Sequence, residues 1–164
     1  GIKSAMGSVP NIFATMAHAP AALEAYLRMN GALSGGQIGD QLKERIALAV
    51  AGYNGCDYCA SAHSYLGDKA GISEEEIKQA LKGEASDEKT QAALSFVRAL
   101  LENRGRVSDA DVSTVKDAGY SEEEIIEMVA HVALNTFTNY FNETTLTEID
   151  FPTKVSTKDV RKVA

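Results

Sequence analysis

Residues 54–63 read Asn-Gly-Cys-Asp-Tyr-Cys-Ala-Ser-Ala-His and hold both cysteines of the chain and one of its three histidines. The Asn-Gly pair lies between two helical patterns, so it predicts the end of a helix rather than a β-hairpin. A new helix is expected to begin near Cys56, which would place both sulfurs in or near its first turn. His63 follows Cys59 by four residues and would lie one turn further along the same helix face.

This arrangement indicates thiol chemistry. The thiolate is the reactive form of cysteine, and both the positive end of a helix and a protonated histidine lower the pKa of a thiol. An imidazole one turn away can take the proton of Cys59 directly or through one water. Cys56 is three residues from Cys59, within reach of a disulfide once one sulfur is oxidised.

On both sides of residues 54–63, the hydrophobic pattern of the chain predicts an all-α protein. Helices are expected at about 10–17, 20–33, 39–53, 56–70, 74–82, 87–103, 109–118 and 122–142. Two of them begin with a Ser-Glu-Glu-Glu capping box, at Ser73 and Ser121. No alternating strand pattern is present, and residues 143–164 are expected to form an irregular tail.

The chain also contains an internal repeat. Residues 70–77 (AGISEEEI) recur as residues 118–125 (AGYSEEEI), at an offset of 48 residues. The repeat predicts a single domain over 1–164, a helical bundle of two related units, of which the second spans about 87–142. At this offset four residues of the first unit have counterparts without thiol or imidazole groups: Glu44 with Ala92, Cys56 with Arg104, Cys59 with Val107 and His63 with Asp111. The second unit is therefore expected to build the same helices without these groups.

Composition restricts the possible partners. The 164 residues are 45% hydrophobic and carry a formal net charge of −7, which argues against binding nucleic acid or an anionic membrane surface. The sequence has no apolar run of membrane-spanning length and no signal-peptide pattern. Two neighbouring cysteines in such a chain indicate redox or metal chemistry, and we expect the protein in the reducing cytoplasm.

Three segments together carry a family resemblance. Residues 44–50 (ERIALAV), residues 54–59 (NGCDYC) and Ala62-His63 resemble the core of the alkylhydroperoxidase AhpD-like proteins, in the carboxymuconolactone decarboxylase superfamily. The resemblance is strongest over residues 36–80. Val9-Pro10-Asn11 and Asp150-Phe151-Pro152 are further similar to the "peroxidase-related" branch. The resemblance implies an AhpD-like helical bundle that assembles as a homo-oligomer, a trimer or hexamer.

The resemblance also implies roles for individual residues. Cys59 would attack a peroxide, Cys56 would resolve the sulfenic acid to a disulfide, and a dithiol or thioredoxin-like partner would restore both thiols. Glu44 and His63 match the proton-relay carboxylate and histidine of the family. Tyr58 stands where the best-studied members have a histidine, and a tyrosine is a hydrogen-bond donor but a poor base near neutral pH. No bound cofactor or metal is needed, because the cysteines carry the electrons.

A polar stripe lies on the last expected helix. His131, Asn135 and Asn139 are spaced by four residues among apolar neighbours, and buried polar groups need partners. The stripe predicts part of a substrate pocket, a polar seam between subunits or a solvated edge of the helix.

These observations favour a thiol-dependent peroxidase that acts on a small-molecule peroxide. Other readings remain open at this point. The cysteines could be buried structural thiols, or they could bind a metal together with His63 and Glu44. The protein could be a lactone-acid decarboxylase, as the superfamily name suggests, although that chemistry needs no cysteine pair. It could also be a redox- or metal-responsive oligomer without enzymatic activity.

Overall fold

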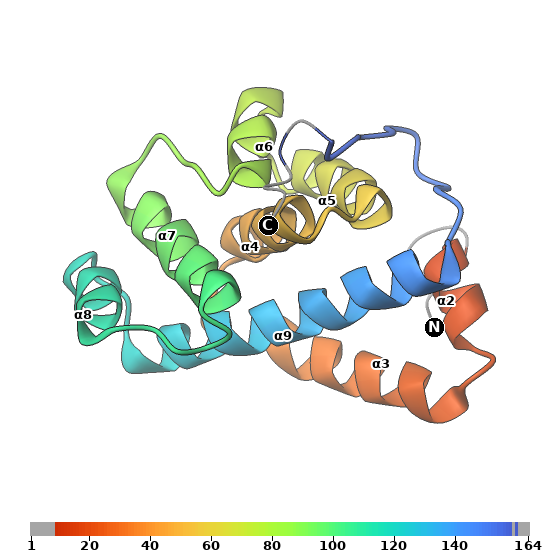
Figure 1. Ribbon diagram of the computed structural model, residues 1–164, viewed down its shortest axis with the longest axis horizontal. Coiled ribbons are helices and arrows are strands. Elements are labelled where there is room, and N and C mark those ends of the chain that lie inside the picture. The colour runs from red at the N-terminus through yellow and green to blue at the C-terminus, as the bar shows by residue number, and fades with distance from the viewer. Residues whose placement is uncertain (1–8, 159, 161–164) are drawn as a thin grey trace.

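The computed structural model describes residues 9–158 and 160, and every regular element in these residues is an α-helix (Figure 1). The all-α class and the expected helix positions are confirmed. The described helices are α2 (Asn11–Met16), α3 (Pro20–Ser34), α4 (Asp40–Asn54), α5 (Asp57–Lys69), α6 (Glu74–Leu81), α7 (Glu88–Glu102), α8 (Asp109–Asp117) and α9 (Glu122–Thr145). Helix α9 continues three residues beyond its expected end at 142. None of the described helices has the length and apolar character needed to cross a membrane.

Helix α4 is the central element of the bundle. It contacts α5, α6, α7 and α9, which surround it (Figure 1). Residues 45–52 are all buried, and the side chains of Ile46, Leu48 and Val50 have no exposed surface. A helix that is apolar on most of its circumference belongs in a protein core. The cysteine-containing stretch therefore leaves directly from the core helix.

Two glycines, one within α4 and one at its C-terminus, determine how the chain packs and turns there. Gly55 has φ 75°, the left-handed conformation that ends many helices and that glycine adopts without strain. The expected helix end at Asn-Gly is thus confirmed. A β-carbon at Gly52 would collide with the backbone carbonyl of Leu81. Helices α4 and α6 can therefore approach each other closely at this point.

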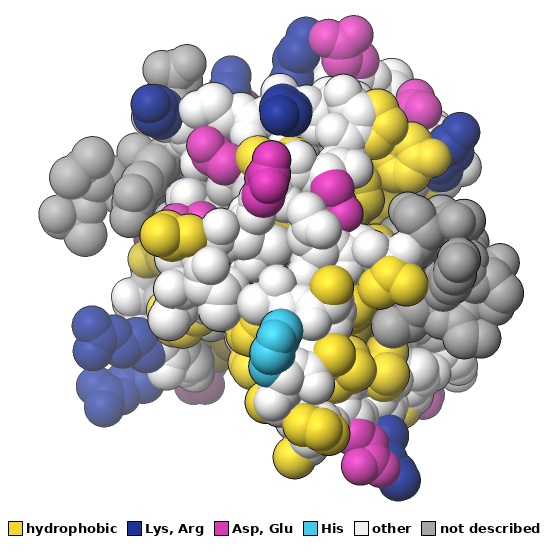
Figure 2. Space-filling model, turned by 90° about the vertical axis from the view of Figure 1, so that its right-hand side faces the viewer, with side chains coloured by type: hydrophobic (Ala, Val, Ile, Leu, Met, Phe, Trp, Pro, Cys, Tyr) yellow, Lys and Arg dark blue, Asp and Glu magenta, His cyan; other side chains and the backbone are white. Residues whose placement is uncertain are grey.

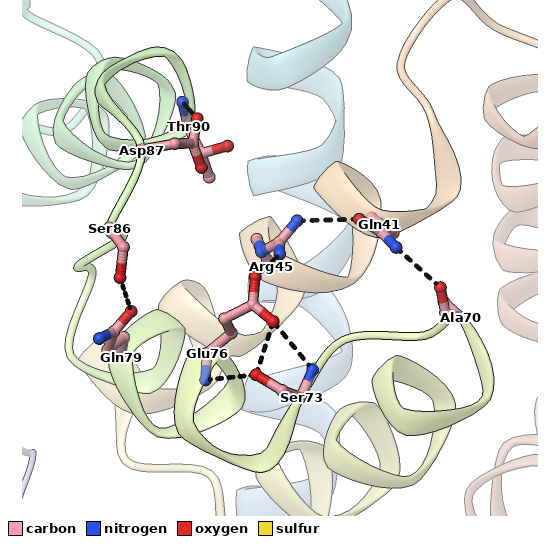
Figure 3. A network of polar contacts seen from close by, with 9 residues as sticks. All are labelled: Gln41, Arg45, Ala70, Ser73, Glu76, Gln79, Ser86, Asp87 and Thr90. Atoms are coloured by element: carbon pink, nitrogen blue, oxygen red, sulfur yellow. Dashed lines mark hydrogen bonds and ion pairs between the residues drawn. The ribbon is translucent and has the colours of Figure 1, made fainter.

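A buried arginine connects α4 to the start of α6 (Figure 3). The Nη2 atom of Arg45 lies 2.6 Å from Oε1 of Glu76, and its Nη1 donates to Gln41 at 3.3 Å. Glu76 is also the third residue of α6 and closes the capping box that begins at Ser73. Gln41 in turn donates to the carbonyl oxygen of Ala70 at 3.0 Å. This network holds the loop between α5 and α6 against the core helix.

The second unit of the repeat departs from the first at its middle helix. Helices α7 and α9 begin 48 residues after α4 and α6, as the repeat predicts. The counterpart of Asp57, where α5 begins, is Gly105, but α8 begins four residues later, at Asp109. Arg104 and Gly105 have φ values of 53° and 82°, which end the helical path, and Ser108 then caps α8. The second unit therefore has its middle helix where the sequence predicts it, at about 109–118, but this helix begins later than the offset of 48 residues would place it.

Helices α2 and α3 form an arm that lies beside α9 (Figure 1). None of the 15 residues of α3 is buried, although many of them are apolar. The side of the molecule with this arm shows apolar side chains at the surface between charged ones (Figure 2). The arm is thus packed more loosely than the core helices.

The C-terminal segment, residues 146–158, is not helical but is bound to α5. The backbone N–H of Val155 donates to the Ser61 hydroxyl at 2.9 Å, and that of Thr157 donates to Asp57 Oδ1 at 2.7 Å. The segment returns from the end of α9 across α5 (Figure 1). It was expected to be irregular, but its hydrogen bonds place it against the helix that carries the cysteines.

Candidate functional site

Both cysteines lie at the N-terminus of α5. Cys56 is the N-cap residue, and its sulfur accepts a hydrogen bond from the backbone N–H of Cys59 at 3.3 Å. Both are free thiols, and their exposed fractions are 0% for Cys56 and 3% for Cys59. The capping role holds Cys56 at the helix end, while Cys59 stands one turn inside, where it lines a cavity. A reagent in that cavity would meet Cys59 first.

The pKa values of the two thiols are shifted in opposite directions. The pKa of Cys59 is lowered to about 7, chiefly because the Cys56 thiol donates a hydrogen bond to its sulfur. The charge of His63 and an amide hydrogen bond from Asn142 lower the pKa further, whereas burial of the thiol raises it. The pKa of Cys56 is raised, because its proton is shared with Cys59 and because it is buried. The proton therefore stays on Cys56, and the thiolate forms on Cys59 near neutral pH.

His63 is paired with Glu44. The Nδ1 atom of His63 lies 2.8 Å from Oε2 of Glu44, which projects from α4. Burial would lower the pKa of His63, but the charge of Glu44 and the hydrogen bond to it outweigh burial, so the pKa is raised. The side chains are about one-fifth exposed, at 22% and 20%, and both line the same cavity as Cys59. A protonated His63 next to the thiol favours the thiolate and can supply a proton to a leaving group.

Asn142 is a further residue of the candidate site, one that the sequence pattern did not single out. It is buried on α9, and its Nδ2 donates to the sulfur of Cys59 at 3.2 Å. It continues the stripe of His131, Asn135 and Asn139, but three residues after Asn139 instead of four. Because i+3 and i+4 share a helix face, this spacing is the signal that could have found it.

The stripe on α9 divides between the cavity and the core. His131 and Asn135 line the cavity, with Asn135 donating to the carbonyl oxygen of His131 at 2.9 Å. Asn139 is fully buried and accepts a hydrogen bond from Asn54 at 3.0 Å, and it also helps to lower the pKa of Cys59. Asn139 therefore lies in the core near the thiols and does not line the cavity.

The ring and the hydroxyl of Tyr58 have different surroundings. Its ring lines the cavity, but its hydroxyl donates to Asp150 at 2.9 Å and accepts from the backbone N–H of Ile12 at 3.3 Å. Asp150 also accepts from the N–H of Asn11 at 2.8 Å, and the ring of Phe151 packs edge-on against Tyr58 at 5.6 Å. The hydroxyl thus joins the start of α2 to the segment that follows α9, and its hydrogen bonds go to these segments instead of to the thiols.

The cavity has a volume of about 520 Å³. Residues from α2, α3, α4, α5, α9 and the C-terminal segment line it, and they include Cys59, His63, Glu44 and Tyr58. Within residues 9–158 and 160, no cluster of three or more His, Cys, Asp or Glu side chains has the geometry to hold a metal ion. The polar groups nearest the reactive thiol are the second thiol, the His63–Glu44 pair and amides.

The fold and the site define an all-helical protein with a Cys-x-x-Cys pair at a helix N-terminus, beside a histidine–carboxylate pair and a cavity. The chain belongs to the carboxymuconolactone decarboxylase family, which residues 20–102 match. A comparison with curated proteins finds none that matches the chain.

Solved structures share the fold. An alkylhydroperoxidase AhpD core protein from Ralstonia eutropha JMP134, an uncharacterized peroxidase-related protein, has a TM-score of 0.84 at 23% identity, with 91% of this chain and 81% of that chain covered. A peroxidase-related protein from Silicibacter sp. TM1040 has a TM-score of 0.82 at 20% identity, with 90% and 80% covered. The debrominase Bmp8 without ligand has a TM-score of 0.78 at 25% identity, with 91% and 82% covered. The AhpD-like fold is therefore shared over most of each chain.

Proposed function

We propose that the protein is a thiol-dependent peroxidase that reduces organic peroxides with the pair Cys56 and Cys59. The observation that carries this proposal is the position of Cys59, which lines a cavity with the His63–Glu44 pair and accepts a hydrogen bond from Asn142 at 3.2 Å. These neighbours lower the pKa of Cys59 to about 7. A thiolate near neutral pH is the nucleophile that peroxide reduction needs.

The reaction proceeds in three balanced steps. The Cys59 thiolate attacks the outer oxygen of ROOH, the O–O bond breaks, and His63 supplies the proton that releases ROH and leaves Cys59 as a sulfenic acid. The Cys56 thiol then condenses with the sulfenic acid, which forms a disulfide and water. A dithiol reductant, thioredoxin-like or small, exchanges with the disulfide and restores both thiols while its own sulfurs become oxidised. No other electron carrier is required, and we place this chemistry in the cytoplasm, where thiols are kept reduced.

Two cysteine variants test the proposal. Cys59→Ser is expected to abolish the consumption of cumene hydroperoxide in the presence of dithiothreitol. Cys56→Ser is expected to retain one turnover and to leave a sulfenic acid on Cys59, which dimedone labels and mass spectrometry locates. Labelling of Cys56 in Cys59→Ser, with none of Cys59 in Cys56→Ser, would reverse the roles. Unchanged peroxide consumption in both variants would exclude the proposal.

Reductive dehalogenation is a second candidate. It is favoured by the aromatic side chains in the cavity, from Phe13, Tyr26 and Phe151, together with the 25% identity to the debrominase Bmp8. A variant of that debrominase, in which an alanine replaces one cysteine, has been solved in complex with 2,3,4-tribromopyrrole. The same two thiols would convert an aryl bromide and two S–H groups into the arene, a disulfide, bromide and a proton. Release of bromide from a brominated pyrrole, without peroxide consumption, would favour this candidate over the first.

A further inference from the structure

Two short segments that are far apart in the sequence meet at the cavity. Residues 9–11 (Val-Pro-Asn) lead into α2, and residues 150–152 (Asp-Phe-Pro) follow α9. Both lie beside the C-terminal end of α9 (Figure 1). We propose that a hydrogen-bonded clasp between them, centred on Tyr58 and Asp150, holds an aromatic wall that selects neutral organic ligands with a ring-sized apolar body. The reaction of such a ligand at Cys59 rests on the proposed function, whereas its binding at the wall does not.

The carboxylate of Asp150 is the centre of the clasp. Its Oδ1 accepts a hydrogen bond from the Tyr58 hydroxyl at 2.9 Å, and its Oδ2 accepts from the backbone N–H of Asn11 at 2.8 Å. The Tyr58 hydroxyl accepts in turn from the backbone N–H of Ile12 at 3.3 Å. The side chain of Asn11 also donates to the carbonyl oxygen of Glu148 at 3.0 Å. One tyrosine of α5 and one carboxylate thus join the start of α2 to the segment that follows α9, through hydrogen bonds that include charge-assisted ones.

The hydroxyl of Tyr58 is suited to this holding role. Tyr58 is only 4% exposed, and burial raises its pKa, so the hydroxyl keeps its proton near neutral pH. It can therefore donate to the carboxylate of Asp150 and accept from a backbone N–H at the same time. A phenylalanine at this position would keep the ring in the cavity but could not connect the two segments.

The aromatic wall consists of Phe13, Tyr58 and Phe151, which all line the cavity. The ring of Phe151 packs edge-on against Tyr58, with 5.6 Å between the centroids, and lies 6.1 Å from the ring of Tyr65. Phe13 packs against Tyr26 of α3 at 5.5 Å. These separations are typical of favourable aromatic pairs. Phe13 and Phe151 belong to the two clasped segments, so the clasp determines where their rings stand.

The wall is adjacent to the reactive thiol. Tyr58 directly precedes Cys59 in the first turn of α5, and both residues line the cavity. The cavity has a volume of about 520 Å³, and cavities of several hundred Å³ are typical of sites for organic ligands. A ligand whose reactive end reaches Cys59 would therefore place its body against these rings.

The charged side chains around Cys59 that line the cavity are paired within the protein. His63 lies 2.8 Å from Glu44, and Lys43 lies 3.3 Å from Asp40. The ammonium group of Lys69 lies over a tyrosine ring, 5.5 Å from its centroid. A charged ligand would lose its hydration in the cavity without gaining an unpaired counter-charge. The cavity therefore favours a neutral ligand.

Binding of an unreactive alcohol tests the wall without any peroxide chemistry. The probe is 2-phenyl-2-propanol, the alcohol that the reduction of cumene hydroperoxide would release, and calorimetric titration of the Cys59→Ser protein measures its affinity. It is expected to bind at least about tenfold more tightly than tert-butanol, because its phenyl group buries apolar surface against the rings. It should also bind more tightly than 2-methyl-2-phenylpropanoate, which carries a carboxylate. Equal or tighter binding of tert-butanol or of the carboxylate would overturn the proposal.

Matched variants in the same background separate the clasp from the wall. Phe151→Ala removes one ring and is expected to weaken the binding of 2-phenyl-2-propanol about tenfold, whereas Phe151→Tyr keeps the ring and should retain it. Tyr58→Phe keeps the ring but breaks the clasp. It is expected to weaken binding about three- to tenfold and to speed the hydrogen exchange of residues 10–13 and 148–152 together. Tyr65→Phe is the control, because it removes a hydroxyl outside the clasp from the same helix, and it should change neither.

Each contrary result has a defined meaning. Unchanged hydrogen exchange in Tyr58→Phe would show that the clasp does not hold the two segments, and faster exchange with unchanged binding would show that the wall does not depend on it. Equal weakening by Tyr58→Phe and Tyr65→Phe would show a general effect of losing a hydroxyl. Any of these results would overturn the proposal.

The reaction provides a separate test in the protein with both cysteines. Tyr58→Phe and Phe151→Ala should each lose at least about fivefold more of their kcat/KM for cumene hydroperoxide than for hydrogen peroxide, which is too small to contact the whole wall. Equal losses for the two peroxides would refute selection by the wall. Binding of 2-phenyl-2-propanol as expected, together with no consumption of either peroxide, would exclude the proposed function but not the wall.

Discussion

At the residue scale, the acidity of Cys59 depends on which groups donate to its sulfur. The thiol is 3% exposed, and burial alone would raise its pKa. Hydrogen bonds from Cys56 and Asn142 and the charge of His63 reverse that effect. The lowered pKa of Cys59 thus depends on these neighbours and not on the Cys-x-x-Cys spacing alone.

Removing the amide donor should raise the pKa of Cys59. We expect Asn142→Leu to shift the midpoint of thiolate absorbance at 240 nm, measured in the Cys56→Ser background, to higher pH. Asn135→Leu is the control, because Asn135 lies on the same helix and in the same cavity but donates to a carbonyl oxygen. A shift of the same size in both variants would mean that cavity polarity, not the hydrogen bond to sulfur, sets the pKa.

The pH dependence follows from the direction of the shift. Because the pKa of Cys59 is lowered to about 7, its thiolate forms below the range of an ordinary thiol, and reaction with iodoacetamide should increase through pH 7. Glu44→Gln removes the charge that raises the pKa of His63, so His63 becomes neutral at lower pH. The pH midpoint of the reaction of Cys59 with iodoacetamide should then move to higher pH.

Peroxide consumption is expected to fall about 10²- to 10⁴-fold in His63→Gln. A wild-type rate in a folded His63→Gln protein would remove His63 from the mechanism.

At the scale of elements, the repeat provides a direct comparison between two helix starts. The capping boxes at Ser73 and Ser121 are equivalent, but only the first involves an arginine, since Glu76 pairs with Arg45 at 2.6 Å. Glu124, the counterpart of Glu76, makes no ion pair with any residue that the structure describes. The two units therefore share the cap but not the connection to the core.

This difference predicts unequal stabilities. Glu76→Gln keeps the capping box but leaves the buried Arg45 without its anion, and it should lower the free energy of unfolding by about 1–3 kcal/mol. Glu124→Gln should cost clearly less, because only the helix-end charge is lost. Urea denaturation followed by circular dichroism measures both. Equal losses would show that the ion pair with Arg45 contributes nothing beyond the cap.

At the scale of the whole molecule, apolar side chains remain at the surface of the arm and of α9. On α9 the exposed fractions of Ile126, Phe137 and Tyr140 are 70%, 41% and 62%, and on α3 Leu27 is 39% exposed. Apolar side chains also reach the surface on the face drawn in Figure 2. Extended apolar surface of this kind often lies between subunits.

This surface, together with the family resemblance, leads us to predict a homo-oligomer, a trimer or hexamer, with α3 and α9 at an interface close to the cysteine site. Light scattering after size-exclusion chromatography measures the subunit number directly. The double variant Ile126→Glu, Tyr140→Glu places charges on exposed positions and should dissociate the assembly without unfolding the helices. A monodisperse monomer of the unmodified chain at micromolar concentration would refute the prediction.

The sequence by itself determined the helices, their ends and the local geometry of the thiols. Helix positions follow from the 3.6-residue period, the capping boxes follow from a serine and an acidic residue three positions later, and Gly55 ends α4 because it adopts φ 75° without strain. The relation of His63 to Cys59 is also local, since four residues in a helix always make one turn. Each of these depends on residues that are close in sequence.

Only the tertiary structure decided which distant groups meet the thiols. Asn142 reaches Cys59 across 83 positions, and the Tyr58 hydroxyl turns to Asp150 across 92. Asn139 shares the polar stripe with His131 but lies in the core, whereas Thr138 and Asn142, before and after it on the same helix, line the cavity, because the cavity borders only one strip of the α9 surface. A helical period specifies which face a residue occupies, but the crossing of whole helices specifies what that face contacts.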